Sequence, residues 1–217
     1  GERLEQLYRG NLANVDDQLD DLLRRAAADP DLLVVLTSDH GEALGQHGSY
    51  GHGYELWAEC LDIPSLWAGP GVSVGHTVRS PTSTVDVLPT LVELCALPEP
   101  SSSRDGRSLV PLLAGASDED PRPIVASGRY NVGNVPAQVV RLGSLKLVLS
   151  GDGHAALYDL DADPLEQRDV SAEHPDVTTQ LLALARSRRD LGADLAERDR
   201  VDIPVHEAEL RALGYLK

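Results

Sequence analysis

The sequence predicts an α/β fold, in which a mostly parallel sheet flanked by helices is followed by a small antiparallel sheet with a packed helix. An amphipathic helical pattern leads into an apolar run at residues 32–36 that does not alternate, which is typical of a strand covered on both faces. Beyond residue 121, short β-rich runs separated by glycine-containing turns indicate an antiparallel meander. We therefore expect two parts, residues 1–118 and 119–217.

The first helix is expected over residues 4–23. Its apolar residues recur at steps of three to five: Leu4, Leu7, Leu12, Val15, Leu19 and Leu22. On the opposite face, Asp20 and Asp21 lie four residues before Arg24 and Arg25, the order that favours ion pairs on an exposed helix. We interpret these acidic residues as a solvated face rather than a metal site. Pro30 then ends the helix.

The other elements follow from the same periodicities and from their turn residues. In the first part we expect a glycine-rich loop at 41–53, a helix at 54–61, a strand at 63–68 and helices at 84–97 and 109–113. The β-rich runs cover 124–130, 138–142, 145–149 and 156–160, and a long polar helix is expected at 175–198.

Composition excludes several classes of protein. The chain is 41% hydrophobic and 25% charged, as globular proteins are. Its 19 Lys and Arg against 35 Asp and Glu give a net charge of -16, which argues against general nucleic-acid binding. No apolar run approaches the roughly 20 residues of a membrane-spanning helix. There is no Met, even at position 1, so we expect a chain that is processed or truncated at its N-terminus.

The candidate site directly follows the strand at residues 32–36, at the sheet edge where open α/β folds place ligand groups. Asp39 offers a carboxylate, His40 offers an imidazole, and Gly41 allows the turn that both need to reach one ion. The alternative is that Asp39 caps a turn while His40 packs at a strand end. His47 and His52 lie on the same loop, which favours a functional loop.

A series of short motifs follows the candidate strand in a fixed order. The motifs are Ser38-Asp39-His40-Gly41-Glu42, Leu44-Gly45-Gln46-His47-Gly48, Gly51-His52-Gly53, Leu56-Trp57-Ala58-Glu59, Ile63-Pro64-Ser65-Leu66, Gly69-Pro70-Gly71, Asp105-Gly106-Arg107-Ser108-Leu109, Leu157-Tyr158-Asp159-Leu160 and Asp163-Pro164-Leu165-Glu166. In this order and spacing they resemble the C-terminal half of a formylglycine-dependent sulfatase of the alkaline phosphatase superfamily. The resemblance covers nearly the whole chain.

This resemblance implies that Asp39 and His40 are two ligands of a divalent metal, most often Ca²⁺, with Mn²⁺, Mg²⁺ or Zn²⁺ as alternatives. It also implies that His52 contacts the sulfate and the leaving-group oxygen, where an imidazolium can neutralise or protonate the departing charge. For His47 we expect a structural role. For Lys146 and Arg129, a solvated strand position is expected rather than contact with a sulfated sugar.

The family's nucleophile, a formylglycine made within a Cys/Ser-x-Pro-x-Arg motif, has no counterpart in these residues. Neither Cys60 nor Cys95 fits that motif, and we expect both to be small buried hydrophobes. Asp39 and His40 offer at most three ligand atoms, whereas Ca²⁺ takes about six to eight. We therefore expect the chain alone to be inactive and to need the N-terminal half of a sulfatase as its partner.

The expected substrate of the complete enzyme is a small-molecule or carbohydrate sulfate ester. Two alternatives stay open: a phosphodiesterase or phosphonate ester hydrolase of the same superfamily, and a non-enzymatic remnant domain.

Overall fold

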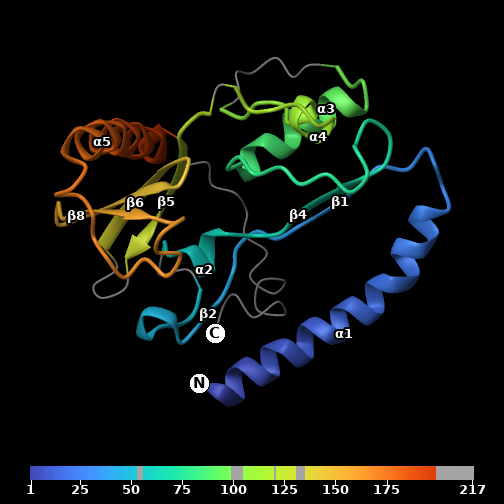
Figure 1. Ribbon diagram of the computed structural model, residues 1–217, viewed down its shortest axis with the longest axis horizontal. Coiled ribbons are helices and arrows are strands. Elements are labelled where there is room, and N and C mark those ends of the chain that lie inside the picture. The colour runs from blue at the N-terminus through green and yellow to red at the C-terminus, as the bar shows by residue number, and fades with distance from the viewer. Residues whose placement is uncertain (53–55, 99–104, 120, 131–134, 199–217) are drawn as a thin grey trace.

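A computed structural model describes residues 1–52, 56–98, 105–119, 121–130 and 135–198. Helix α1 (Glu2–Ala27) lies apart from the sheets along most of its length (Figure 1). Of its residues only Ala26 is buried. The predicted ion pairs are present, since Arg24 pairs with Asp20 and Arg25 Nη2 lies 2.7 Å from Asp21 Oδ2. Among the described helices, α1 included, none has both the length and the apolar character needed to cross a bilayer.

The apolar strand at the start of the site is β1 (Val34–Thr37), and it pairs with β4 (Ser65–Ala68). The two strands run antiparallel, with Val34 opposite Ala68, so the expected parallel pairing is wrong for this strand. A parallel partner would require a crossover to the same end of the sheet. Here the chain turns back after β1 instead, and all the strand pairs within the described residues are antiparallel.

The glycine-rich loop contains a small hairpin that periodicity did not predict. Strand β2 (Ala43–Leu44) pairs with β3 (Tyr50–Gly51), and the 3₁₀ turn η1 (Gln46–Gly48) joins them. Helix α2 (Ala58–Leu61) follows; residues 54 and 55 of the helix expected there lie outside the described part of the chain. The hairpin and α2 set the geometry of the candidate site.

The segment after β4 packs around the buried carboxylate of Asp86. Asp86 accepts hydrogen bonds from the backbone N–H groups of Ser83 and Arg107, each at 2.9 Å, and it pairs with Arg122. It joins the turn η2 (Thr84–Asp86) to helix α3 (Val87–Leu94). Helix α3 ends earlier than predicted and leaves Cys95 exposed, whereas Cys60 is buried as expected. The short helix α4 (Val110–Leu113) forms as predicted and packs against β4 and α3 through Trp67 and Leu94.

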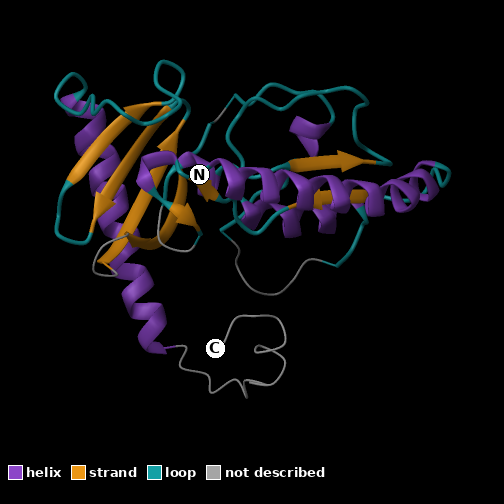
Figure 2. Cartoon of the chain, turned by 90° about the horizontal axis from the view of Figure 1, so that it is seen from below, coloured by secondary structure: helices purple, strands orange, loops and turns teal. Residues whose placement is uncertain are grey.

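The second part is the predicted meander with its helix. Strands β5 (Ile124–Tyr130), β6 (Val135–Leu142), β7 (Leu145–Ser150) and β8 (Ala155–Asp159) form one antiparallel sheet in sequence order. Helix α5 (Pro175–Arg198) lies across one face of this sheet (Figure 2). The division near residue 118 stays a prediction.

The core of this part uses both faces of the four-stranded sheet, because successive side chains of a strand point to opposite sides. Val140, Leu147 and Leu157 pack against α5. Val139 and Val148 face the other way and pack on Leu56, just before α2. The sheet therefore supports the segment that carries α2, which in turn contacts the candidate site.

Candidate active site

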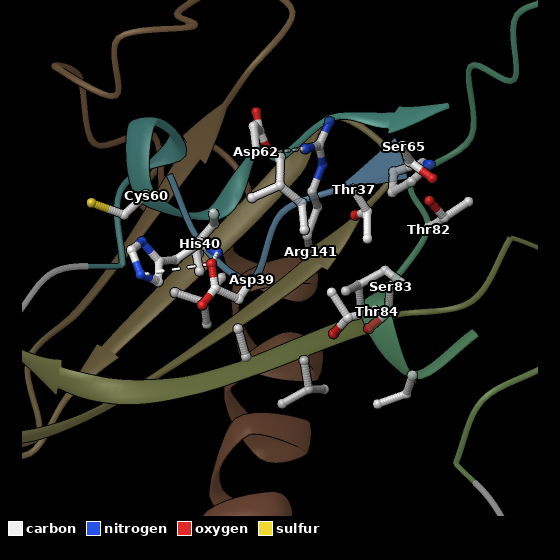
Figure 3. A pocket seen from close by; sticks show the side chains of 18 of the residues that line it. Thr37, Asp39, His40, Cys60, Asp62, Ser65, Thr82, Ser83, Thr84 and Arg141 are labelled. Carbon is white, nitrogen blue, oxygen red and sulfur yellow. Dashed lines mark hydrogen bonds and ion pairs between the residues drawn. The ribbon is translucent and has the colours of Figure 1, made fainter. Parts of the chain in front are cut away.

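Asp39 and His40 come together at the end of β1, as the sequence predicted. The backbone there is held against α2, because Gly41 N–H donates to Cys60 O and Glu42 N–H donates to Glu59 O, each at 2.9 Å. A Cβ on residue 41 would collide with the Glu59 carbonyl, so only glycine fits at this close approach. Figure 3 shows the two side chains beside each other, with Asp39 Oδ1 3.7 Å from His40 Nε2.

The hydrogen bonds of Asp39 and His40 leave each with atoms free for a ligand. A hydrogen bond from its own backbone N–H lowers the pKa of the exposed Asp39 carboxyl, and the nearby His40 charge lowers it further. The carboxyl is therefore ionised at neutral pH. His40 Nδ1 lies 2.8 Å from Gly41 O, which can only accept, so Nδ1 carries the proton and Nε2 has a free lone pair in the neutral ring.

His52 belongs to the same patch. Its ring stacks on that of His40, with 4.1 Å between centroids and 25° between planes. The side chains of Asp39, His40 and His52 are 79%, 41% and 48% exposed, so the patch is open to solvent. The structure thus brings together all three residues singled out for metal binding and catalysis.

Glu42 also belongs to this patch, although the sequence suggested no role for it. Its Oε2 lies 2.9 Å from His52 Nδ1. The register of the hairpin brings these two residues together, since the pairing of Ala43 with Gly51 places Glu42 opposite His52. A two-residue strand is too short for periodicity to reveal that register.

His47, by contrast, is a structural residue, as expected. Its Nδ1 lies 3.0 Å from Glu59 Oε1 and its Nε2 lies 2.9 Å from the carbonyl oxygen of Leu165. Its ring stacks on Trp57 with 4.0 Å between centroids. Both ring nitrogens are therefore engaged, and the histidine ties the hairpin loop to the segment after β8.

Lys146 has a different environment from the solvated strand position predicted for it. Its ammonium is buried, with Nζ 2.5 Å from Oε1 of the equally buried Glu166. The other carboxylate oxygen of Glu166 accepts a hydrogen bond from Ala58 N–H at 2.7 Å. The prediction failed because the outer face of β7 is covered by α2, a contact that local sequence cannot show. The side chain of Arg129 lies outside the described residues.

A cavity of about 560 Å³ opens beside Asp39 and His40 (Figure 3). The four-stranded sheet contributes Ser127 and Arg141 to its wall, and Arg141 Nη1 lies 3.1 Å from Asp62 Oδ1. The end of β1 and the second part of the chain therefore share one hollow, lined by both polar and apolar residues and large enough for a small ester.

Comparison with known proteins identifies the family of the chain. The sulfatase family model matches residues 3–96, the stretch that contains Asp39, His40 and His52. The choline-sulfatase of Rhizobium meliloti is 31% identical over 214 residues, covering 96% of this chain and 41% of the relative. The chain belongs to the sulfatase family. It spans about two fifths of the length of this relative.

Solved structures of similar hydrolases share the fold. The phosphonate monoester hydrolase of Agrobacterium radiobacter superposes with a TM-score of 0.68 at 29% identity, covering 86% of this chain and 40% of the hydrolase. A 2-O GAG sulfatase superposes with a TM-score of 0.64 at 26% identity, covering 87% of this chain and 42% of that protein. The α/β fold class of the sulfatases is therefore confirmed.

Proposed function

We propose that this chain supplies part of the active site of a metal-dependent sulfuric ester hydrolase. The observation that carries the proposal is the grouping of an ionised Asp39 with the stacked rings of His40 and His52 at the end of β1. Asp39 and His40 line the cavity, and all three residues lie within the stretch that matches the sulfatase family.

Asp39 and His40 would hold the divalent metal, with Ca²⁺ as the ion that the family resemblance implies and Mn²⁺, Mg²⁺ or Zn²⁺ as alternatives. The anionic Asp39 suits any of these ions, whereas the free Nε2 of His40, whose orientation the Gly41 carbonyl sets, suits Zn²⁺ better than Ca²⁺. A bound metal offsets negative charge on the ester's non-bridging oxygens. We infer that the remaining ligands and the formylglycine nucleophile come from polypeptide outside these 217 residues.

His52 would contact the sulfate group and protonate the leaving-group oxygen. Glu42 engages Nδ1 of His52 and so leaves Nε2 to face the ester. In its protonated form, the ring can donate a proton from Nε2 to the departing oxygen. His52 is thus the catalytic residue that this chain contributes.

The substrate would be a small-molecule or carbohydrate sulfate ester, since the similar proteins include a choline-sulfatase and a 2-O GAG sulfatase. A phosphonate ester hydrolase is the second candidate, because the hydrolase from Agrobacterium radiobacter superposes with the higher TM-score of the two structures. A non-enzymatic domain is the third.

Ester hydrolysis by matched histidine variants tests the proposal. An aryl sulfate and an aryl phosphonate monoester are assayed with the 217-residue chain and with a polypeptide that joins it to a nucleophile-bearing segment. We expect turnover only in the joined polypeptide, faster on the sulfate. His52→Gln should lower kcat by about 100-fold or more, because general acid catalysis is lost. The control His76→Gln alters an exposed histidine that does not line this cavity, and it should leave kcat unchanged.

Other outcomes of this assay decide among the alternatives. Full activity of His52→Gln would remove His52 from the mechanism. Ordinary turnover by the 217-residue chain alone would show that the site is not shared. Preference for the phosphonate would favour the second candidate, and no turnover of either ester in the joined polypeptide would favour a non-enzymatic domain.

A further inference from the structure

The hairpin gathers three potential ligands that differ from the Asp39–His40 pair. Glu42 and His52 lie opposite each other, one position beyond the Ala43–Gly51 pair, and directly opposed residues have Cβ atoms about 5 Å apart. His40 lies two residues before Glu42 and stacks on His52. One ligand atom from each of His40, Glu42 and His52 lies within 4.8 Å of the others.

The chemistry of these ligands selects a different class of ion from Ca²⁺. Two imidazole nitrogens and one carboxylate oxygen suit Zn²⁺, Co²⁺ or Ni²⁺, whereas Ca²⁺ takes oxygen ligands almost throughout. Three protein ligands are also the number found in zinc sites that keep a fourth position open. The triad therefore matches a borderline transition metal.

We propose that His40, Glu42 and His52 bind one transition-metal ion, of which Zn²⁺ is the test case. Tetrahedral ligands about 2.0–2.1 Å from zinc stand about 3.3 Å apart. Glu42 Oε2 and His52 Nδ1, at 2.9 Å, are already near that spacing, and since one ligand atom of each residue lies within 4.8 Å of the others, no pair of these atoms has to approach by more than about 1.5 Å. The exposed fractions of the three side chains, 41%, 24% and 48%, leave room for this adjustment and for entry of the ion.

Occupation of the triad has a consequence for the proposed hydrolase site. His40 cannot serve both ions, and His52 bound to a transition metal is withdrawn from the ester. Zn²⁺ is therefore expected to inhibit any hydrolase that contains this chain. The metal site itself needs only described residues of this chain, so it does not depend on the proposed activity.

Zinc binding to the tag-free 217-residue chain tests the proposal directly. Isothermal titration with Zn²⁺, in a millimolar excess of Ca²⁺, should show one site per chain. Glu42→Gln and His52→Gln should each weaken Zn²⁺ binding about tenfold or more, because each replaces a metal ligand with an amide of similar size. Asp39→Asn, which alters the neighbouring pair, and His76→Gln, which alters a remote histidine, should leave the affinity unchanged.

X-ray absorption of the zinc-loaded chain gives a readout without any substitution. We expect two imidazole nitrogens and one carboxylate oxygen about 2.0–2.1 Å from zinc. A single imidazole, or a loss of affinity in Asp39→Asn as large as in Glu42→Gln, would place the ion at the Asp39–His40 pair and overturn the proposal. If His76→Gln lost as much Zn²⁺ affinity as Glu42→Gln, the binding would be adventitious, and the proposal would be overturned as well.

Discussion

At the scale of single residues, the Lys146–Glu166 pair shows how burial changes the role of a charged side chain. Burial lowers the pKa of the Lys146 ammonium, and the Glu166 carboxylate opposes that shift. Glu166 also adopts a left-handed backbone, with φ of 51°, which is uncommon outside glycine. Since Glu166 holds the first turn of α2 at Ala58, this pair links the second part of the chain to the segment beside the candidate site.

Removal of one charge from this pair should be costly. We expect Lys146→Met to lower the free energy of unfolding by about 3–5 kcal/mol, because it leaves the Glu166 carboxylate buried without a counter-charge. Urea denaturation measures the change. The double variant Lys146→Met/Glu166→Gln should recover part of the loss, since the remaining charge is gone.

A matched control for Lys146 is available on α1. Arg9→Met breaks the exposed ion pair with Glu5, in which the two side chains are 75% and 44% exposed. Such a pair contributes about 0.5 kcal/mol or less. If Lys146→Met destabilised the protein no more than Arg9→Met does, the buried pair would have no role in holding α2.

At the scale of elements, the contact between the end of β1 and α2 decides the site. Long periodic elements were predicted well, among them α1, α5 and the four strands of the meander. The β2–β3 hairpin was not predicted, because its strands are two residues long and carry no readable period. The site depends on this hairpin and on α2, which are the elements with the weakest local signal.

A glycine substitution tests this contact. We expect Gly41→Ala to lower the free energy of unfolding by about 1–3 kcal/mol, because the new Cβ would overlap the Glu59 carbonyl and push α2 away. Gly10→Ala is the control, since a Cβ there meets nothing within 4 Å on exposed α1. Alanine in a helix interior should stabilise by up to about 1 kcal/mol. Urea denaturation measures both changes. If the two variants lost equal free energy of unfolding, the close contact between residue 41 and the Glu59 carbonyl would be contradicted.

At the scale of the whole molecule, the chain combines a well-packed second part with a site that faces solvent. The meander and α5 share a core that contains the fully buried residues Leu147 and Leu157. In contrast, α1 exposes the apolar stripe that predicted it, with Leu4, Leu7 and Leu22 each more than half exposed. Asp39 and His40 follow β1, are exposed and offer few ligand atoms of their own.

The whole chain should therefore bind Ca²⁺ only weakly. We expect a dissociation constant above about 1 mM by isothermal titration, because Asp39 and His40 offer too few oxygen ligands for a tight site. Asp39→Asn should remove the residual binding, whereas Asp161→Asn, an exposed carboxylate in the second part, should not. Micromolar binding would mean that these residues alone complete a Ca²⁺ site.

The sequence by itself determined the family, the order of the long elements and the candidates Asp39, His40 and His52, because hydrophobic period and motif order are local properties of a chain. Only the tertiary structure decided the antiparallel pairing of β1, the burial of Lys146 and the meeting of Glu42 with His52. These depend on which segments meet after the chain folds back. The pairing of β1 and the burial of Lys146 join segments far apart in the sequence, and the hairpin that brings Glu42 to His52 has strands too short to show a period.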